Sequence, residues 1–281
     1  MSKGILLFAR NNSHVDYIKL AYFFAKRARD ILDLPVSVVT DSKDFLLLQH
    51  KDAEQVFDEI ISFENDSKGN IRLFRDGGLA SKRLEWKNSG LRHAYDLSPY
   101  DETIVLDTDI VITNKNFLKC FDSQYDLMMY DHCVDLVGID RGIEFTSISD
   151  TSVDFYWATV IFFRKTDENK IFFDLIQHIY DNWKHYVNVY QLTSMLYRND
   201  FAVSIAVHIM NGFQSGNFVK SIPGNLYYTT DKSILWEIDG NSLFLLLEKP
   251  DYTGEYTALR IKDANVHVMN KFSLNRCIDE Q

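Results

Sequence analysis

The chain has 281 residues, of which 46% are hydrophobic and 25% are charged. This composition is typical of a folded globular protein and excludes a disordered or fibrous chain. The net charge of −10 argues against broad, nonspecific binding to nucleic acid, although a local basic groove is compatible with it.

Targeting signals and cysteine usage favour a cytoplasmic protein, or one in the host cytoplasm if the chain is viral. The apolar run at residues 5–9 is ended by Arg10 too early for a signal peptide. No apolar run approaches the roughly 18 residues of a transmembrane helix, so we expect no membrane insertion. The three cysteines show no CxxC spacing, which argues against a disulfide framework or a zinc site.

The first 41 residues predict a βαβ unit. Residues 5–9 have the pattern of a buried strand, residues 14–32 that of a helix with Ser13 as its N-cap, and residues 36–39 that of a second strand. Two strands joined by a helix at this spacing belong to a parallel sheet. We therefore predict an α/β fold and a single domain over residues 1–281.

The remaining elements are predicted in chain order. A short helix is expected at 45–49, a strand at 59–63, a loop at 64–78, a helix at 81–95 and a strand at 103–106. Strands are then expected at 127–130 and 156–164, helices at 170–186 and 200–210, and alternating strands at 227–248. The tail from residue 265 is expected to be a short terminal segment on which folding depends little.

Two acidic residues directly after the strand at 103–106 are the most informative pattern. Asp107 and Asp109 point the same way on extended backbone, because strand side chains alternate. Such a pair repels itself unless a cation or proton lies between the carboxylates. Since oxygen ligands suit Mg²⁺ and Mn²⁺, and since ligands bind at the carboxyl ends of strands in open α/β sheets, the pattern predicts a metal site. The alternative is a pair of aspartates in a surface turn.

Residues 81–86 and 100–111, which contain this Asp pair, resemble the core of the glycogenin and bacterial galactosyltransferase group. That group is the retaining family 8 of GT-A glycosyltransferases. The resemblance implies a GT-A fold, which is a Rossmann-like mixed sheet flanked by helices with the DxD motif at a strand end. It also implies a nucleotide-sugar donor, with a uridine diphosphate sugar as the expected one, and Mn²⁺ or Mg²⁺ as cofactor.

The resemblance also implies roles for other residues. His267 matches the histidine that completes the metal site with Asp107 and Asp109, and Asp200 matches the aspartate that orients the transferred sugar or the acceptor. Nucleotide-binding roles are implied for Phe8, Ala9, Arg10, Asn11, Tyr17, Lys82, Thr108 and Lys271. The chain departs from the group at Asn270, where the group has glycine, and at Phe201, where it has glutamine.

One further candidate comes from position alone. Asp41 follows the second strand and could accept a hydrogen bond from the base or the ribose, but a capping turn explains it equally well. The basic residues around Lys82 could contact a diphosphate or could form a solvated helix face.

These observations predict a metal-dependent, retaining glycosyltransferase. The alternatives are a haloacid-dehalogenase-like phosphatase, whose nucleophile also follows an apolar strand in a DxD motif, and a non-catalytic module that binds sugar nucleotides. The overall character of the sequence resembles tailed-phage genes. Because phage glycosyltransferases commonly modify hydroxymethylated DNA bases or glycans, the acceptor is expected to be DNA or a glycan.

Overall fold

A mixed β-sheet lies at the centre of the computed structural model, which describes residues 1–64, 70–138, 146–149 and 153–279. Its strand order is β11-β8-β10-β6-β1-β2-β3. Neighbouring strands pair parallel except for β10, which runs antiparallel to both β6 and β8. The strands are β1 (Lys3–Phe8), β2 (Val36–Thr40), β3 (Ile60–Ser62), β6 (Glu102–Leu106), β8 (Leu127–Tyr130), β10 (Trp157–Arg164) and β11 (Lys220–Ser221).

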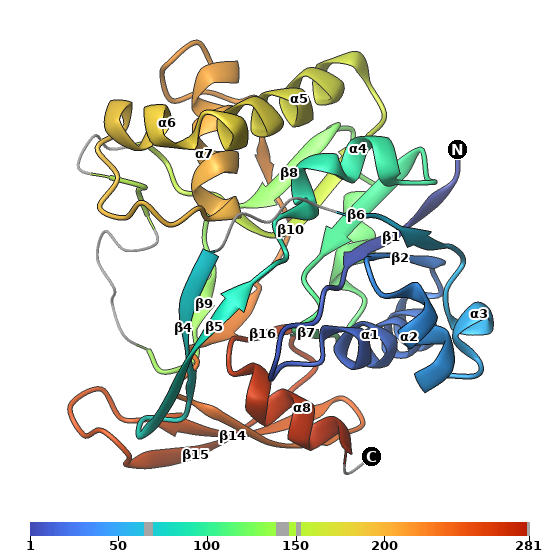
Figure 1. The fold of residues 1–281 in the computed structure, drawn as a ribbon, viewed down its shortest axis with the longest axis vertical. Coiled ribbons are helices and arrows are strands. Elements are labelled where there is room, and N and C mark those ends of the chain that lie inside the picture. Colours follow the sequence, from blue (N-terminus) through green and yellow to red (C-terminus); the bar gives the residue numbers. More distant parts are fainter. Residues whose placement is uncertain (65–69, 139–145, 150–152, 280–281) are drawn as a thin grey trace.

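Helices flank this sheet, as the sequence predicts for the α/β class. Figure 1 shows α1, α2 and α3 gathered at the lower right, and α5, α6 and α7 across the upper part of the molecule. The helices are α1 (Tyr17–Leu32), α2 (Lys43–Gln49), α3 (Ala53–Val56), α4 (Ala94–Leu97), α5 (Asp167–Asp181), α6 (Trp183–Val189), α7 (Asn199–Met210) and α8 (Lys271–Asp279). Two short 3₁₀ helices cover Gly90–His93 and Asn116–Cys120. Within the described ranges, no helix is both long enough and apolar enough to cross a bilayer.

The first βαβ unit is confirmed, but its helix has a different cap from the predicted one. Helix α1 begins at Tyr17, and the Asp16 carboxylate accepts a hydrogen bond from the Lys19 backbone N–H at 3.0 Å. The predicted cap, Ser13, lies in a turn that the Asn12 side chain closes by accepting from the Val15 N–H. The helix start was misplaced because Ser13 and Asp16 are both good N-cap residues.

The segment predicted as a loop and a helix is instead a β-hairpin. Strand β4 (Asn70–Asp76) pairs antiparallel with β5 (Ala80–Trp86), and Gly77 adopts φ +77 in the turn between them. The predicted helix at 81–95 is wrong except near its end, where the first 3₁₀ helix and α4 lie. Of the strand residues in the hairpin, only Phe74 and Leu84 are buried, so apolar spacing does not define its strands. Residues 65–69 of the expected loop lie outside the described residues.

Two smaller sheets lie beside the main one. The first has the order β7-β16-β12-β9, and the second is the antiparallel sheet β13-β14-β15. Their strands are β7 (Ile110–Val111), β9 (Val134–Asp135), β12 (Tyr227–Thr229), β13 (Ile234–Asp239), β14 (Ser242–Glu248), β15 (Tyr256–Lys262) and β16 (Val266–Val268). The strands predicted at 227–248 are confirmed. The β4–β5 hairpin reaches this second sheet, where the Gly78 N–H donates to the Tyr256 hydroxyl at 2.9 Å (Figure 1).

The C-terminal segment is part of the packed structure. Strand β16 lies between β7 and β12, and Val266 and Val268 are fully buried. The buried Asn270 side chain donates to the Ser233 carbonyl at 2.8 Å and accepts from the Ser273 N–H at 3.0 Å. The expectation of a terminal segment on which folding depends little is therefore wrong, because removing it would take an inner strand out of a four-stranded sheet.

Candidate active site

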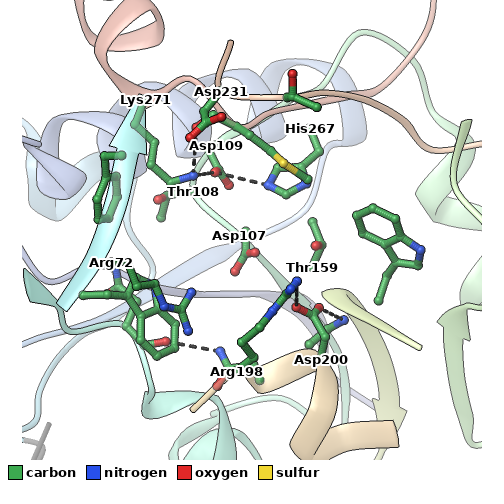
Figure 2. A pocket seen from close by; sticks show the side chains of 18 of the residues that line it. Arg72, Asp107, Thr108, Asp109, Thr159, Arg198, Asp200, Asp231, His267 and Lys271 are labelled. Atoms are coloured by element: carbon green, nitrogen blue, oxygen red, sulfur yellow. Dashed lines mark hydrogen bonds and ion pairs between the residues drawn. The ribbon is translucent and has the colours of Figure 1, made fainter. Parts of the chain in front are cut away.

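A cavity of about 470 Å³ opens at the carboxyl end of β6. Its lining comes from distant parts of the chain, including the end of β1, the start of α1, the β4–β5 hairpin, the start of α7, β16 and the start of α8. Figure 2 shows Asp107 near the middle of this cavity. The position agrees with the general placement of ligand sites at strand carboxyl ends in α/β sheets.

Backbone hydrogen bonds hold the predicted metal ligands together. The Asp107 N–H donates to the Thr159 carbonyl on β10 at 3.0 Å, and the Val268 N–H donates to the Asp109 carbonyl at 2.9 Å. Pairing of β7 with β16 places His267 opposite Ile110. One potential ligand atom from each of Asp107, Asp109 and His267 lies within 4.8 Å of the others. The fold thus brings together three residues that the sequence predicted as a set.

The geometry of this cluster fits a divalent cation. The Nε2 atom of His267 lies 3.2 Å from Oδ2 of Asp109. Two ligands about 2.1 Å from one ion and at right angles to each other are about 3.0 Å apart, so both atoms could contact a single ion. The Asp107 carboxylate makes no hydrogen bond or ion pair with any described residue, and it is exposed to solvent in the cavity. Its oxygens are therefore open to a ligand.

Charge in the cluster is unevenly distributed. The Nζ atom of Lys271 lies 2.6 Å from Oδ2 of the buried Asp109. Burial alone would raise the pKa of Asp109, but Lys271 and then His267 outweigh it and hold that pKa well below its usual range. Enclosure in the cavity, followed by the charge of Asp109, raises the pKa of Asp107 to about 7. A cation would relieve this repulsion between the two carboxylates.

Tyr17 adds an unsatisfied polar group to the same cavity. The residue is 4% exposed, and its hydroxyl has no hydrogen-bond partner among the described residues. Burial raises its pKa to about 12, so the phenol keeps its proton at neutral pH. A buried hydroxyl without a partner is costly, and a bound acceptor oxygen would satisfy it.

Asp200 also lies at the cavity, as predicted. It is the second residue of α7, and its Oδ1 accepts from the Ala158 N–H at 3.0 Å while its Oδ2 accepts from Arg198 at 3.1 Å. These two bonds fix the orientation of the carboxylate. Phe8 and Thr108, both predicted to contact nucleotide, line the cavity too.

Other predicted nucleotide contacts lie away from the cavity lining. Arg10 pairs with Asp41 at 2.8 Å, and Ala9 is fully buried beside β2, where its N–H donates to the Val39 carbonyl. Asn11 stabilises the start of α1 by accepting from the Ile18 N–H at 3.0 Å. Lys82 is exposed on β5 rather than placed at a helix start. The structure does not bring these residues to the metal cluster.

Several cavity residues were not predicted from the sequence. They include Arg72 and Trp86 on the hairpin, Arg198 before α7, Trp157 on β10 and Asp231 after β12. The single local signal was the spacing of Arg198 and Asp200, two residues apart. The hairpin residues had no usable signal because their segment was predicted as a loop and a helix.

Comparisons with known proteins show no family model and no curated protein that matches the chain. Among solved structures, the glycosyltransferase GlyE of Streptococcus pneumoniae TIGR4 aligns over 79% of this chain at 11% identity with a TM-score of 0.43. The galactosyltransferase LgtC, in complex with donor and acceptor sugar analogs, aligns over 78% of this chain and 72% of its own at 10% identity and TM-score 0.43. The bifunctional IspDF of Campylobacter jejuni aligns over 80% of this chain and 50% of its own at 12% identity and TM-score 0.40. The chain spans less than half of GlyE, 46% of its length.

Proposed function

We propose that the chain is a metal-dependent glycosyltransferase that moves a sugar from a uridine diphosphate sugar to an acceptor. The observation that carries this proposal is the cluster of Asp107, Asp109 and His267, whose potential ligand atoms lie within 4.8 Å of one another at the carboxyl end of β6. The adjoining cavity of about 470 Å³ is within the usual size range of small-molecule sites. The resemblance of residues 100–111 to family 8 supports the same reaction and implies retention of configuration.

Each residue of the site has a defined task in this proposal. Asp107, Asp109 and His267 would hold Mn²⁺ or Mg²⁺, and His267 favours Mn²⁺ because imidazole suits transition metals. The ion would supply positive charge against the diphosphate leaving group. Lys271 would leave Asp109 and donate to a phosphate oxygen, and the Tyr17 hydroxyl would donate to the same ligand.

Asp200 would hold the sugar or the acceptor. Its carboxylate is fixed by the Ala158 N–H and by Arg198, so its remaining lone pairs face the cavity in one orientation. A fixed acceptor of this kind would orient a sugar hydroxyl at low entropic cost.

The direct test is thermal unfolding with nucleotides. Uridine diphosphate with Mn²⁺ is expected to raise the melting temperature by roughly 5–10 °C at 100 times its Kd, because a ligand that binds only the folded state stabilises it by about 2.7 kcal/mol at that concentration. The nucleotide alone should give a smaller shift.

Three results would count against parts of this proposal. No shift with any nucleoside diphosphate and Mn²⁺ would refute nucleotide-sugar binding. A larger shift with guanosine or cytidine diphosphate would refute the uridine assignment. Binding without release of uridine diphosphate from any donor would instead favour a non-catalytic sugar-nucleotide-binding module.

Lys271 provides a separate prediction about the metal. Its Nζ atom lies 2.6 Å from Oδ2 of Asp109, so the ammonium group competes with a cation for that oxygen. Replacing Lys271 with Met should tighten Mn²⁺ binding in the absence of nucleotide by roughly tenfold, equivalent to about 1.4 kcal/mol. The same substitution should weaken binding of uridine diphosphate, because a phosphate donor is lost.

Titration calorimetry with Mn²⁺ and then with nucleotide would measure both effects. Lys19→Met is the matched control, since it removes an ammonium group that pairs with Asp279 away from the cavity. Only Lys271→Met is expected to tighten Mn²⁺ binding and weaken the binding of uridine diphosphate. Weaker Mn²⁺ binding in this variant would show that Lys271 supports the metal site rather than competing at it.

A further inference from the structure

A second group of cationic side chains lies in the cavity, apart from the metal cluster. Arg72 comes from β4, and Arg198 directly precedes α7. Figure 2 shows both arginines on the side of Asp107 that faces away from Lys271 and His267. The cavity therefore has two cationic ends, and the diphosphate assigned to Lys271 and the metal accounts for one of them.

Arg72 is enclosed without a carboxylate partner. Its guanidinium carbon lies 3.6 Å from the centre of the Trp86 ring, and one of its N–H groups donates to the Tyr197 carbonyl. No acidic side chain of the described residues forms an ion pair with it. Burial, and then the charge of Arg198, lowers the pKa of Arg72 to about 10, well above neutral pH, so the group stays charged.

Among the described residues, Asp200 is the one carboxylate that forms an ion pair with either guanidinium group. Asp200 pairs with Arg198 at 3.1 Å and already accepts from the Ala158 N–H. One negative charge thus faces two positive charges, in a chain whose overall net charge is −10. Enclosing a cation without its counter-charge costs several kcal/mol, so this end of the cavity favours an anionic occupant.

The hairpin that carries Arg72 is fixed at both of its ends. Near its base, the Asn70 side chain donates to the Tyr197 carbonyl at 2.9 Å. Near its tip, the Arg75 N–H donates to Asp231 at 3.1 Å and the Gly78 N–H donates to the Tyr256 hydroxyl at 2.9 Å. Arg72 is consequently held in place before a ligand arrives, which lowers the entropic cost of binding.

We propose that Arg72 and Arg198 bind a second anionic group, a carboxylate or a phosphate, carried by the transferred sugar or by the acceptor. This inference rests on the proposed function, which assigns the diphosphate to the metal cluster. The planar fork of arginine matches the two oxygens of a carboxylate or phosphate, whereas a neutral hydroxyl would leave the excess charge uncompensated. The substrate class is therefore an acidic sugar donor or an acidic acceptor.

The test compares acidic and neutral probes by titration calorimetry in saturating Mn²⁺. UDP-glucuronic acid is compared with UDP-glucose for the donor. Glucose 6-phosphate is compared with glucose for the acceptor, both with uridine diphosphate bound and without nucleotide. We expect one acidic probe to bind at least tenfold more tightly than its neutral counterpart. Preference in the first pair identifies the donor as the acidic substrate, and preference in the second identifies the acceptor.

Variants link this preference to the arginines. Arg72→Gln should abolish the preference while the affinity for uridine diphosphate stays within about twofold, and Arg198→Gln provides a second variant if the first does not fold. Arg75→Gln is the matched control, since Arg75 lies on the same strand but does not line the cavity. It should keep the preference.

Three outcomes would be decisive. Equal binding of acidic and neutral probes in both pairs would overturn the inference, because no anion site would exist. An equal loss of uridine diphosphate and UDP-glucuronic acid binding in Arg72→Gln would also overturn it, since the arginines would then hold the diphosphate. Failure of uridine diphosphate to bind the wild-type chain would contradict the proposed function instead. In that case, comparing glucose 6-phosphate with glucose in the absence of nucleotide would still test whether the arginines prefer an anion.

Discussion

Replacing Asp109 with Asn is expected to reduce Mn²⁺ affinity and donor turnover by at least about 100-fold. The substitution removes a proposed metal ligand, and loss of a residue that merely hydrogen-bonds to a ligand often costs roughly 10–100-fold. The buried carboxylate lies 3.2 Å from His267 and 2.6 Å from Lys271, so it is the centre of the cluster. An amide keeps the shape but has no charge to balance a cation. Asp107→Asn should have an effect of the same order, and excess EDTA should reproduce both.

Calorimetry with Mn²⁺ and the release of uridine diphosphate from UDP-sugars would measure these losses. Asp122→Asn is the matched control, because Asp122 is exposed and lies outside the cavity lining. Circular dichroism should show that all three variants remain folded. Full turnover of the wild-type chain in excess EDTA would reject the metal-dependent mechanism.

Replacing Phe172 with Ala is expected to lower the free energy of unfolding by about 3–5 kcal/mol, the usual cost of truncating a buried aromatic side chain. Phe172 lies on α5, is fully buried, and packs against Phe173 and Phe218 with ring centres 5.4 and 5.7 Å away. Because many domains have only 5–15 kcal/mol of stability, this loss is a large part of the total.

Urea unfolding followed by fluorescence would measure the change. Phe45→Ala is the comparison, since Phe45 is 46% exposed on α2 and should change the stability little. A loss below about 1 kcal/mol for Phe172→Ala would mean that the core around α5 closes over the missing ring.

The sequence predicted those parts of the fold in which local pattern and tertiary role agree. Strand β2 of the βαβ unit and strand β6 before Asp107 are short, mainly apolar runs, and all of their residues are buried in the structure. The β4–β5 hairpin was missed because its Ile71 and Leu73 are exposed and many charged residues lie between its few apolar ones, so the sequence shows no buried face. Its conformation depends on contacts with distant residues such as Asp231 and Tyr256, which no local pattern contains.

The residues of the candidate site also divide into those that a local pattern predicts and those that only the folded chain brings together. Asp107 and Asp109 could be found from strand geometry alone, whereas His267 required a resemblance, because nothing local to residue 267 indicates a partner 158 positions away. Arg72 and Arg198 were not predicted because the cavity is formed by segments whose arrangement only the folded chain defines. Arg10 and Asp41 were predicted as ligand contacts but form an ion pair with each other.

The pairing of β7 with β16 has a consequence for biosynthesis. Asp109 meets His267 only after the strand at Val266–Val268 has inserted between β7 and β12, and Lys271 follows that strand directly. A growing polypeptide on the ribosome would carry the first βαβ unit and both aspartates long before it could bind an ion. The complete cluster would form only after residue 271 had left the exit tunnel, so the three candidate ligands would come together in one step that the first βαβ unit cannot perform alone.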